Sequence, residues 1–146
     1  MNTIEINHLL RDYSDCFVGT FPRDRLPQSP IKIRPFSLIM NTDISSKTGE
    51  HWVSIFVDSQ NRAEYFDSFG RAPHYNEIVK FLARNNITNL TYNTHQVQNA
   101  LTATCGLYCV LCIKFRCGGL SFEEFIKHFL QNTISNDLKA YISLLL

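Results

Sequence analysis

The sequence lacks the features that mark membrane, secreted and repeat proteins. No stretch of its 146 residues is apolar for the length that a membrane span needs. The N-terminus has no basic region, and Glu5 interrupts its apolar residues, so we expect no signal peptide. Repeats, low-complexity tracts and linkers are also lacking, which favours one α+β domain over residues 1–146.

The sequence also lacks an excess of positive or negative charge. The formal net charge is only +1, so bulk electrostatics predicts neither strong nucleic-acid binding nor strong binding to a membrane surface. Hydrophobic residues make up 45% of the chain and charged residues 18%, which is ordinary for a globular protein and excludes a disordered one.

Paired CxxC or Cys/His knuckles, the usual zinc motif, do not occur. The chain has five cysteines, an odd number, and four of them lie between residues 105 and 117, which argues against a secreted disulfide framework and for a reducing compartment. Cys105, Cys109 and Cys112 have the C-x3-C-x2-C spacing of radical-SAM cluster ligands. All three fall on one predicted helix, and the chain is too short for the barrel of those enzymes, so we expect no metal site.

The strongest chemical signal is the segment over residues 98–117. Polar residues lead to Cys105-Gly106 and an apolar run follows, which predicts a loop that delivers a cysteine to the first turn of a buried helix. The free N–H groups and the positive dipole end of such a helix favour the thiolate. A thiolate nucleophile also needs a proton acceptor and a donor for the oxyanion that it creates.

Hydrophobic periodicity predicts the remaining elements. Strands are expected over residues 36–42, 51–57, 62–69 and 87–97, and helices over residues 3–13, 75–85 and 134–146. Ser121 and Glu124 predict a capping box for one more helix. The three prolines and one glycine of residues 17–30 predict an irregular surface segment.

The two strands over residues 51–69 form the clearest hairpin and bring two polar residues together. A three-residue loop with Val57 opposite Asn61 places His51 opposite Asp67. A two-residue loop moves the pairing by one residue and leaves the two as neighbours. A carboxylate in this place can orient an imidazole and stabilise its protonated form.

The loop before Cys105 supplies a candidate donor. The side-chain amide of Gln98, together with the backbone N–H of Cys105, could bind a tetrahedral oxyanion. Gly106 could leave room for a substrate backbone beside the sulfur.

Each candidate also has an ordinary structural interpretation. Cysteines in apolar segments are by default small core residues, which fits Cys16 and the three cysteines after Cys105. His51 could be a structural histidine on an edge strand whose hydrogen bonds are satisfied, and Asp67 could be a turn residue before Ser68. The other histidines, which lack an equally placed acid, are expected to be structural or exposed: His8, His74, His95 and His128.

The order and spacing of these motifs resemble those of the adenovirus-type cysteine endopeptidases (adenain), with relatives in Polinton-type elements and large DNA viruses, and more distantly those of SUMO-deconjugating proteases. The matching blocks are His51-Trp52, FDSFG over residues 66–70, Gln98, and Cys105-Gly106-Leu107. Residues 17–27, FVGTFPRDRLP, are similar to the Gly-Thr-aromatic segment of that family. The resemblance covers about residues 13–130.

The resemblance implies a role for each matching residue. Cys105 would be the nucleophile, His51 the general base and acid, Asp67 the orienting carboxylate and Gln98 the oxyanion-hole residue. Substrate contacts would come from Trp52, Gly19, Thr20 and Gly106. The implied fold is papain-like and adenain-like: a central, mostly antiparallel sheet with packed helices and the catalytic cysteine at a helix N-terminus.

The implied function is that of a viral thiol protease. Such enzymes cleave structural precursors after small residues, often Gly-Gly or Gly-x, during virion maturation, so we expect protein substrates such as capsid precursors, no membrane partner, and a place in the host nucleus or virion, or otherwise in the cytoplasm. Removal of ubiquitin-like modifiers is the alternative activity. A catalytically inactive interaction module on the same fold is the alternative from another class.

No bound cofactor is expected, although the adenovirus enzymes use an activating peptide and DNA. The peptide is linked through a cysteine upstream of the glutamine, but Ile87 matches that place and no cysteine lies between Cys16 and Cys105. This argues against a disulfide-tethered activator at that site. The low net charge weakens the expectation of DNA, although a local basic patch could bind it: Arg23, Arg25, Lys32 and Arg34.

Overall fold

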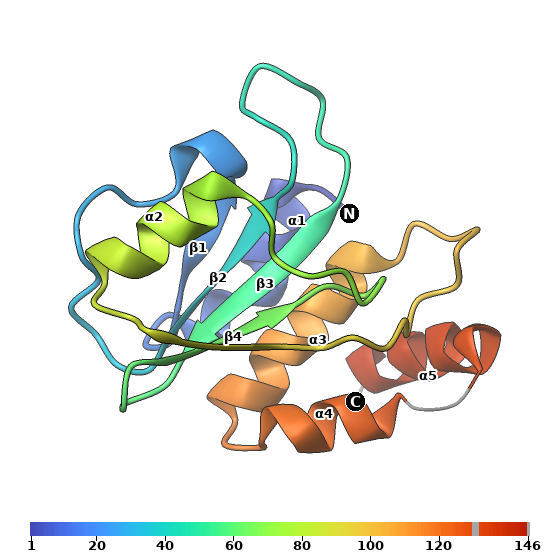
Figure 1. Cartoon of the computed structure of the whole chain (residues 1–146). Helices are drawn as coiled ribbons and strands as arrows, with labels where there is room; N and C mark the ends of the chain where they lie inside the picture. Colours follow the sequence, from blue (N-terminus) through green and yellow to red (C-terminus); the bar gives the residue numbers. More distant parts are fainter. Residues whose placement is uncertain (130–131, 146) are drawn as a thin grey trace.

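A five-stranded sheet forms the centre of the molecule, which we describe from a computed structural model that covers residues 1–129 and 132–145 (Figure 1). The strand order is β1-β2-β3-β4-β5. The strands are β1 (Phe17–Pro22), β2 (Phe36–Asn41), β3 (Trp52–Val57), β4 (Arg62–Phe66) and β5 (Asn89–Tyr92). The helices are α1 (Thr3–Leu9), α2 (Asn76–Arg84), α3 (Cys105–Cys117), α4 (Phe122–His128) and α5 (Thr133–Leu145), with short 3-10 turns η1 (Arg11–Tyr13) and η2 (Arg23–Arg25).

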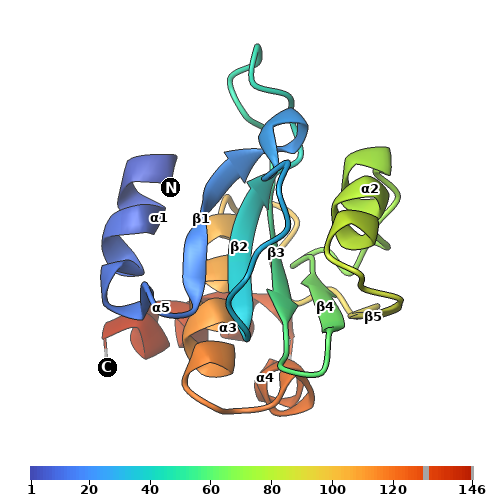
Figure 2. The ribbon, with the colours of Figure 1, turned by 90° about the vertical axis from the view of Figure 1, so that its left-hand side faces the viewer.

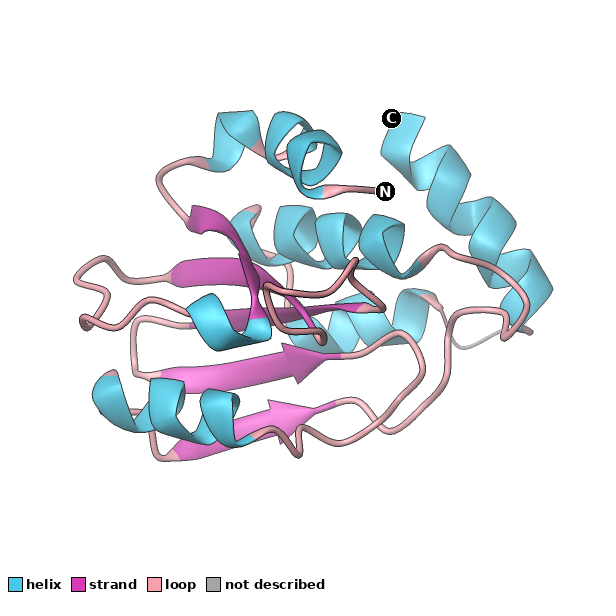
Figure 3. Cartoon of the chain, turned by 90° about the horizontal axis from the view of Figure 1, so that it is seen from above, coloured by secondary structure: helices cyan, strands magenta, loops and turns pink. Residues whose placement is uncertain are grey.

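Helices cover both faces of the sheet (Figures 2 and 3). Each face has its own apolar core. One core joins α1, α3, α4 and α5 to the strands, and the other joins α2 to the opposite face. The alternation of side chains along β2 shows the division, because Ile39 belongs to the first core whereas Leu38 and Met40 belong to the second. The α+β class is confirmed, and α3 lies against β3 and β2.

The sheet is mixed, which corrects the expectation of a mostly antiparallel one. β2 and β3 pair antiparallel, as do β3 and β4, but β1 pairs parallel with β2 and β4 pairs parallel with β5. The two parallel pairs arise because longer connections join their strands, through η2 in one case and α2 in the other.

The first six residues of the segment predicted to be irregular form strand β1. Gly19 has a φ of 147° and lies where the pairing with β2 shifts register, as expected for a bulge. Pro22 ends the strand. Glycine and proline are tolerated here because β1 is an edge strand, and the prediction gave these residues too much weight as loop signals.

The β3–β4 hairpin has the predicted loop length at a position one residue later. Its three-residue loop lies between Asp58 and Arg62, which are joined by a backbone hydrogen bond of 3.0 Å, and Asn61 takes the left-handed conformation with φ of 59°. Val57 consequently pairs with Ala63 and not with Asn61. This shift of two residues in register keeps every side chain on its predicted face of the sheet.

The predicted helices are confirmed in their essentials. α3 begins at Cys105, α4 has the capping box of Ser121 and Glu124, and α5 extends to Leu145. The predicted end of the last helix at residue 146 lies outside the described residues. Within the described ranges, none of the helices combines the length and apolar character needed to traverse a bilayer.

A disulfide joins Cys16 to Cys117, which the sequence did not predict. The two residues are 101 positions apart, and the bond links the start of β1 to the end of α3. Counting cysteines could not identify the pair, because it depends on how α3 packs across the sheet. The free cysteines are Cys105, Cys109 and Cys112.

Candidate active site

His51 and Asp67 form a buried pair at one end of the hairpin. The Nε2 atom of His51 lies 2.8 Å from Oδ1 of Asp67, and both residues are almost fully buried. His51 immediately precedes β3 and Asp67 immediately follows β4. The predicted partnership is therefore present, although the register shift makes the two residues diagonal and not directly opposite.

Neighbouring groups hold both members of this pair. The ring of Phe69 stacks on that of His51 with centroids 5.0 Å apart, and its backbone N–H donates to Asp67 Oδ1 over 2.8 Å. The side chain of Asn93 accepts a hydrogen bond from the Asp67 N–H at 3.0 Å and donates to its carbonyl at 2.7 Å. Asn93 was missed by the sequence analysis, since only the path of the chain after β5 brings it here.

Cys105 is the first residue of α3 and its side chain is half-buried. An interaction with the His51 side chain lowers the pKa of its thiol. Because Nε2 of that ring lies 2.8 Å from Asp67, Nδ1 is the nitrogen left for the sulfur. The sequence placed this cysteine at the start of a helix, and the packing of α3 on β3 brings that start to the hairpin. Cys105, His51 and Asp67 are thus aligned in the order needed for nucleophilic catalysis.

The surroundings favour the charged forms of cysteine and histidine. Burial alone would raise the pKa of Cys105, but hydrogen bonds from His51 and from the backbone at Trp52 and Gly106 outweigh it and lower the pKa below its ordinary value of 9.0. Burial would lower the pKa of His51, but the hydrogen bonds to Asp67 and Cys105 outweigh it and raise the pKa from 6.5 to about 9. The site therefore favours a thiolate beside an imidazolium.

The two other free cysteines have the opposite character. Cys109 and Cys112 are buried inside α3, and burial raises the pKa of Cys109 well above its usual value and that of Cys112 to about 12. These thiols are neutral core side chains, as the ordinary structural interpretation predicted. Among the described residues, no group of three or more His, Cys, Asp or Glu side chains is arranged to hold a metal ion.

Gln98 is buried in the loop before Cys105 and its amide orientation is set by two short hydrogen bonds. Its Oε1 accepts from the hydroxyl of Ser68 at 2.6 Å, and its Nε2 donates to the carbonyl of Thr102 at 2.6 Å. Its backbone N–H bonds to the Ser68 carbonyl. The loop is consequently attached to the segment that carries Asp67, which places Gln98 near the catalytic pair.

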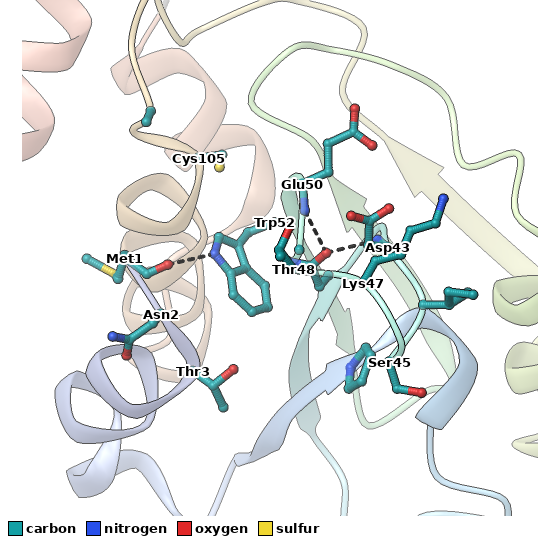
Figure 4. A pocket seen from close by; sticks show the side chains of 15 residues that line it. Met1, Asn2, Thr3, Asp43, Ser45, Lys47, Thr48, Glu50, Trp52 and Cys105 are labelled. Atoms are coloured by element: carbon teal, nitrogen blue, oxygen red, sulfur yellow. Dashed lines mark hydrogen bonds between the residues drawn. The ribbon is translucent and has the colours of Figure 1, made fainter.

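A cleft of about 340 Å³ opens beside the sulfur (Figure 4). The N-terminal residues Met1–Thr3 form one wall and the loop over residues 43–50 forms the other, with Trp52 between them. The side chain of Asn41 holds the loop by accepting from the N–H groups of Asp43 and Glu50. Cys105 and Ala103 line the cleft where it reaches the start of α3.

The structure separates the four predicted substrate-contacting residues into two groups. Trp52 lines the cleft, and its Nε1–H donates to the Met1 carbonyl at 2.9 Å. Gly106 lies next to Trp52 and Met1, and a Cβ at this position would be only 3.1 Å from each of them. The absence of a side chain at Gly106 therefore allows Trp52 and Met1 to pack closely against α3. Gly19 and Thr20 do not line the cleft, because they lie on β1, where the Thr20 hydroxyl bonds to Asn7 of α1.

Comparison of sequences identifies viral cysteine proteases as relatives. The chain is 32% identical over 104 residues to the SUMO-1 cysteine protease of African swine fever virus, a match that covers 62% of this chain and 37% of that protein. It is 31% identical over 122 residues to the protease of bovine adenovirus 2, covering 73% of this chain and 58% of the relative. The chain thus spans less than two thirds of the length of both relatives. No family model matches it.

Comparison of structures finds the same fold in two known proteases. The crystal structure of the African swine fever virus protease superposes with a TM-score of 0.63 at 19% identity, covering 93% of this chain and 64% of that one. The SUMO protease Ulp1, with its catalytic cysteine oxidised to a sulfinic acid, gives a TM-score of 0.56 at 14% identity, covering 88% and 73%. These likenesses show a shared fold. The chain is thus similar in sequence to viral cysteine proteases and shares the fold of the African swine fever virus protease and of Ulp1.

Proposed function

We propose that this chain is a viral-type cysteine endopeptidase. The observation that carries the proposal is the grouping of Cys105, His51 and Asp67, with 2.8 Å between the imidazole and the carboxylate and with His51 lowering the pKa of the Cys105 thiol. A cysteine buried in the core, or a histidine at a sheet edge with its hydrogen bonds satisfied, would each explain one residue. Neither explains why all three residues lie together. The viral proteases to which the chain is similar support the same activity.

Acylation begins with the Cys105 thiolate, which attacks the carbonyl carbon of the scissile peptide bond. The negative charge moves to the carbonyl oxygen, and the tetrahedral species collapses as the C–N bond breaks. The imidazolium of His51 gives its proton to the departing amine, and Asp67 holds the ring in place throughout. The product is a thioester on Cys105 and a neutral imidazole.

Deacylation reverses the roles of the same groups. The neutral His51 accepts a proton from a water molecule that attacks the thioester carbonyl, and the C–S bond then breaks. Cys105 leaves as a thiolate beside the imidazolium, which restores the starting pair. The raised pKa of His51 and the lowered pKa of Cys105 favour this resting state.

Gln98 is proposed to stabilise the oxyanion in both steps. One of its two amide N–H groups is bound to the Thr102 carbonyl, which leaves the other for the substrate oxygen. The free N–H of Cys105 at the first turn of α3 would be the second donor.

The proposed substrates are proteins cleaved after small residues, such as Gly-Gly or Gly-x sequences in capsid precursors during virion maturation in the host nucleus or virion. Crowding beside the sulfur supports small residues, because Trp52 and Met1 fill the space around Gly106. The charged side chains on the loop wall, among them Asp43, Lys47 and Glu50, could select substrate residues further from the bond.

Removal of ubiquitin-like modifiers is the second candidate. One relative is named a SUMO-1 cysteine protease, and the Ulp1 protease domain, whose structure is known in complex with the yeast SUMO orthologue Smt3, shares the fold. The chemistry at Cys105 would be the same and only the substrate would differ.

An activating peptide or DNA is not part of the proposal, although both can be tested. Two of the four arginine and lysine side chains of the predicted basic patch are engaged within the protein. Arg23 pairs with Glu77 at 3.7 Å, and Arg34 bonds to Asn61 at 2.7 Å.

The test is cleavage by the purified protein of a Gly-Gly-containing capsid-type precursor and of a SUMO conjugate, each with and without DNA. We expect cleavage of the precursor after a small residue, and none with Cys105→Ala. Cleavage of the conjugate alone would support the second candidate. Failure to cleave either substrate, together with no labelling of Cys105 by a thiol-protease activity probe, would support the inactive interaction module.

A further inference from the structure

We propose that Asp137, on α5, is a positioning residue that holds the loop over residues 98–104 in the geometry needed to stabilise the oxyanion. The inference deepens the proposed function and rests on it. Asp137 is outside every motif that the sequence analysis identified, and it lies in the part of the chain after Cys105, on the helix that packs against α3 (Figure 1).

The carboxylate of Asp137 is buried and gathers hydrogen bonds from the loop and from α3. Its Oδ2 accepts from the hydroxyl of Thr102 at 2.7 Å, and its Oδ1 accepts from the hydroxyl of Tyr108 at 2.6 Å. Longer bonds of 3.4 Å reach Oδ1 from the backbone N–H of Asn99 and the hydroxyl of Thr104. One side chain thus contacts the beginning, middle and end of the loop.

Thr102 connects this carboxylate to Gln98. Its hydroxyl donates to Asp137 while its carbonyl accepts from Nε2 of Gln98 at 2.6 Å. The direction of the Gln98 amide therefore depends on where Thr102 is held. Because an oxyanion donor acts through a preorganised position, a small displacement of Thr102 would weaken it without affecting the nucleophile.

Asp137 also determines what Thr104 does at the start of α3. A threonine at the N-cap usually accepts a hydrogen bond from an N–H of its own helix. Thr104 occupies the N-cap of α3 but makes no such bond, and its hydroxyl is directed toward Asp137 and Thr102. The hydroxyl is thereby kept away from the N–H groups of the first turn, where the substrate oxygen would bind.

A purely structural role is the competing explanation, since the Tyr108 bond also ties α5 to α3. The two roles differ in what they change. Loss of a tie between helices would lower stability and disturb all chemistry at Cys105. Loss of loop geometry would slow only reactions that build a tetrahedral oxyanion. Alkylation by iodoacetamide is a direct displacement at carbon that builds none, so it separates the two roles.

The experiment compares wild type with Asp137→Ala, Thr102→Val, the double variant, and two controls. Thr102→Ser keeps the hydroxyl, and Ala140→Gly weakens α5 at a buried position in the apolar core. For each variant we would measure kcat and KM on a cleaved peptide, the rate of Cys105 alkylation by iodoacetamide, and the melting temperature.

We expect kcat to fall about tenfold in Thr102→Val and on the order of 10- to 100-fold in Asp137→Ala, which is less than full loss of an oxyanion donor. KM and the alkylation rate should stay within about twofold, the double variant should be no worse than Asp137→Ala, and Thr102→Ser should recover most of kcat. Ala140→Gly should lose stability while keeping kcat.

Two results would overturn the inference: an unchanged kcat in Thr102→Val, or an alkylation rate that falls in parallel with kcat. Thr102 is exposed, so Thr102→Val decides the question even where Asp137→Ala does not fold. Failure of the wild type to cleave any peptide would instead refute the proposed function, which keeps the two failures distinct.

Discussion

The two halves of the proposed site are built in different ways. His51 and Asp67 come from the two ends of one hairpin and are fixed by close neighbours, with Phe69 stacked on the imidazole and Asn93 clamping the aspartate backbone. The loop that carries Gln98 depends on Ser68, which follows the same hairpin, and on Asp137 from the last helix.

This difference separates two tasks in the proposed reaction. In the proposed mechanism the hairpin half handles the proton and sets the charge state of Cys105, so damage there should change pH dependence. The loop half is proposed to receive the negative charge that develops on the substrate, so damage there should change turnover and leave the charge state alone. Each substitution below tests whether the two halves act on the reaction in these separate ways.

The largest effect is expected where the halves meet. Cys105→Ala should abolish hydrolysis, because no other group in the cleft can form the thioester. The melting temperature should stay within a few degrees of wild type, since the thiol is small and half-buried at the helix edge. Measurable turnover by the alanine variant, in protein free of contaminating protease, would assign the chemistry to another residue.

On the hairpin side, Asp67→Asn should lower kcat by about 10²–10⁴-fold, because the imidazole loses its orienting carboxylate. The wild-type dependence of kcat/KM on pH should be a bell: activity rises as Cys105 ionises below its ordinary pKa of 9.0 and falls as His51 loses its proton near its pKa of about 9. Without Asp67 the pKa of His51 drops, so the alkaline limb should move to lower pH. An alkaline limb that stays in place would mean that Asp67 is not what supports the imidazolium.

On the loop side, Gln98→Ala should lower kcat by roughly 10²–10³-fold, the usual cost of losing one oxyanion donor. Unlike the change at Asp67, it should leave both limbs of the pH profile where they are. Comparing full pH profiles of the two variants checks this contrast. A shift of either limb in Gln98→Ala would show that the loop also controls the ionisation of Cys105.

The smallest effect is expected at the cleft wall. Trp52→Phe keeps the aromatic bulk but loses the 2.9 Å bond from Nε1 to the Met1 carbonyl. Removing one such bond should raise KM by about two- to tenfold with kcat nearly unchanged. A large fall in kcat would mean that Trp52 acts on the reacting atoms and does not merely shape the cleft.

The sequence predicted the hairpin half well because that half is local. Period-2 alternation located both strands, and a hairpin that slips by two residues still keeps His51 and Asp67 on the same face of the sheet. The position of Cys105 at the start of α3 was also predictable, because a polar loop gives way abruptly to an apolar run.

The remaining features depend on long-range packing. Asp137 is separated from Thr102 by 35 positions and Asn93 from Asp67 by 26, so no spacing rule connects them. The Cys16–Cys117 disulfide and the parallel pairing of β1 have the same origin. Gly19 and Thr20 lie on β1 and do not line the cleft, so their predicted contact with substrate stays a prediction.

The most direct test of the central claim is the rate of Cys105 alkylation by iodoacetamide as a function of pH, in wild type and in Asp67→Asn. A thiolate held by the imidazolium predicts a wild-type rate that is half-maximal below pH 9.0, with the midpoint displaced toward 9.0 in the variant. A wild-type midpoint at the ordinary value for a thiol, unmoved by the loss of Asp67, would contradict it.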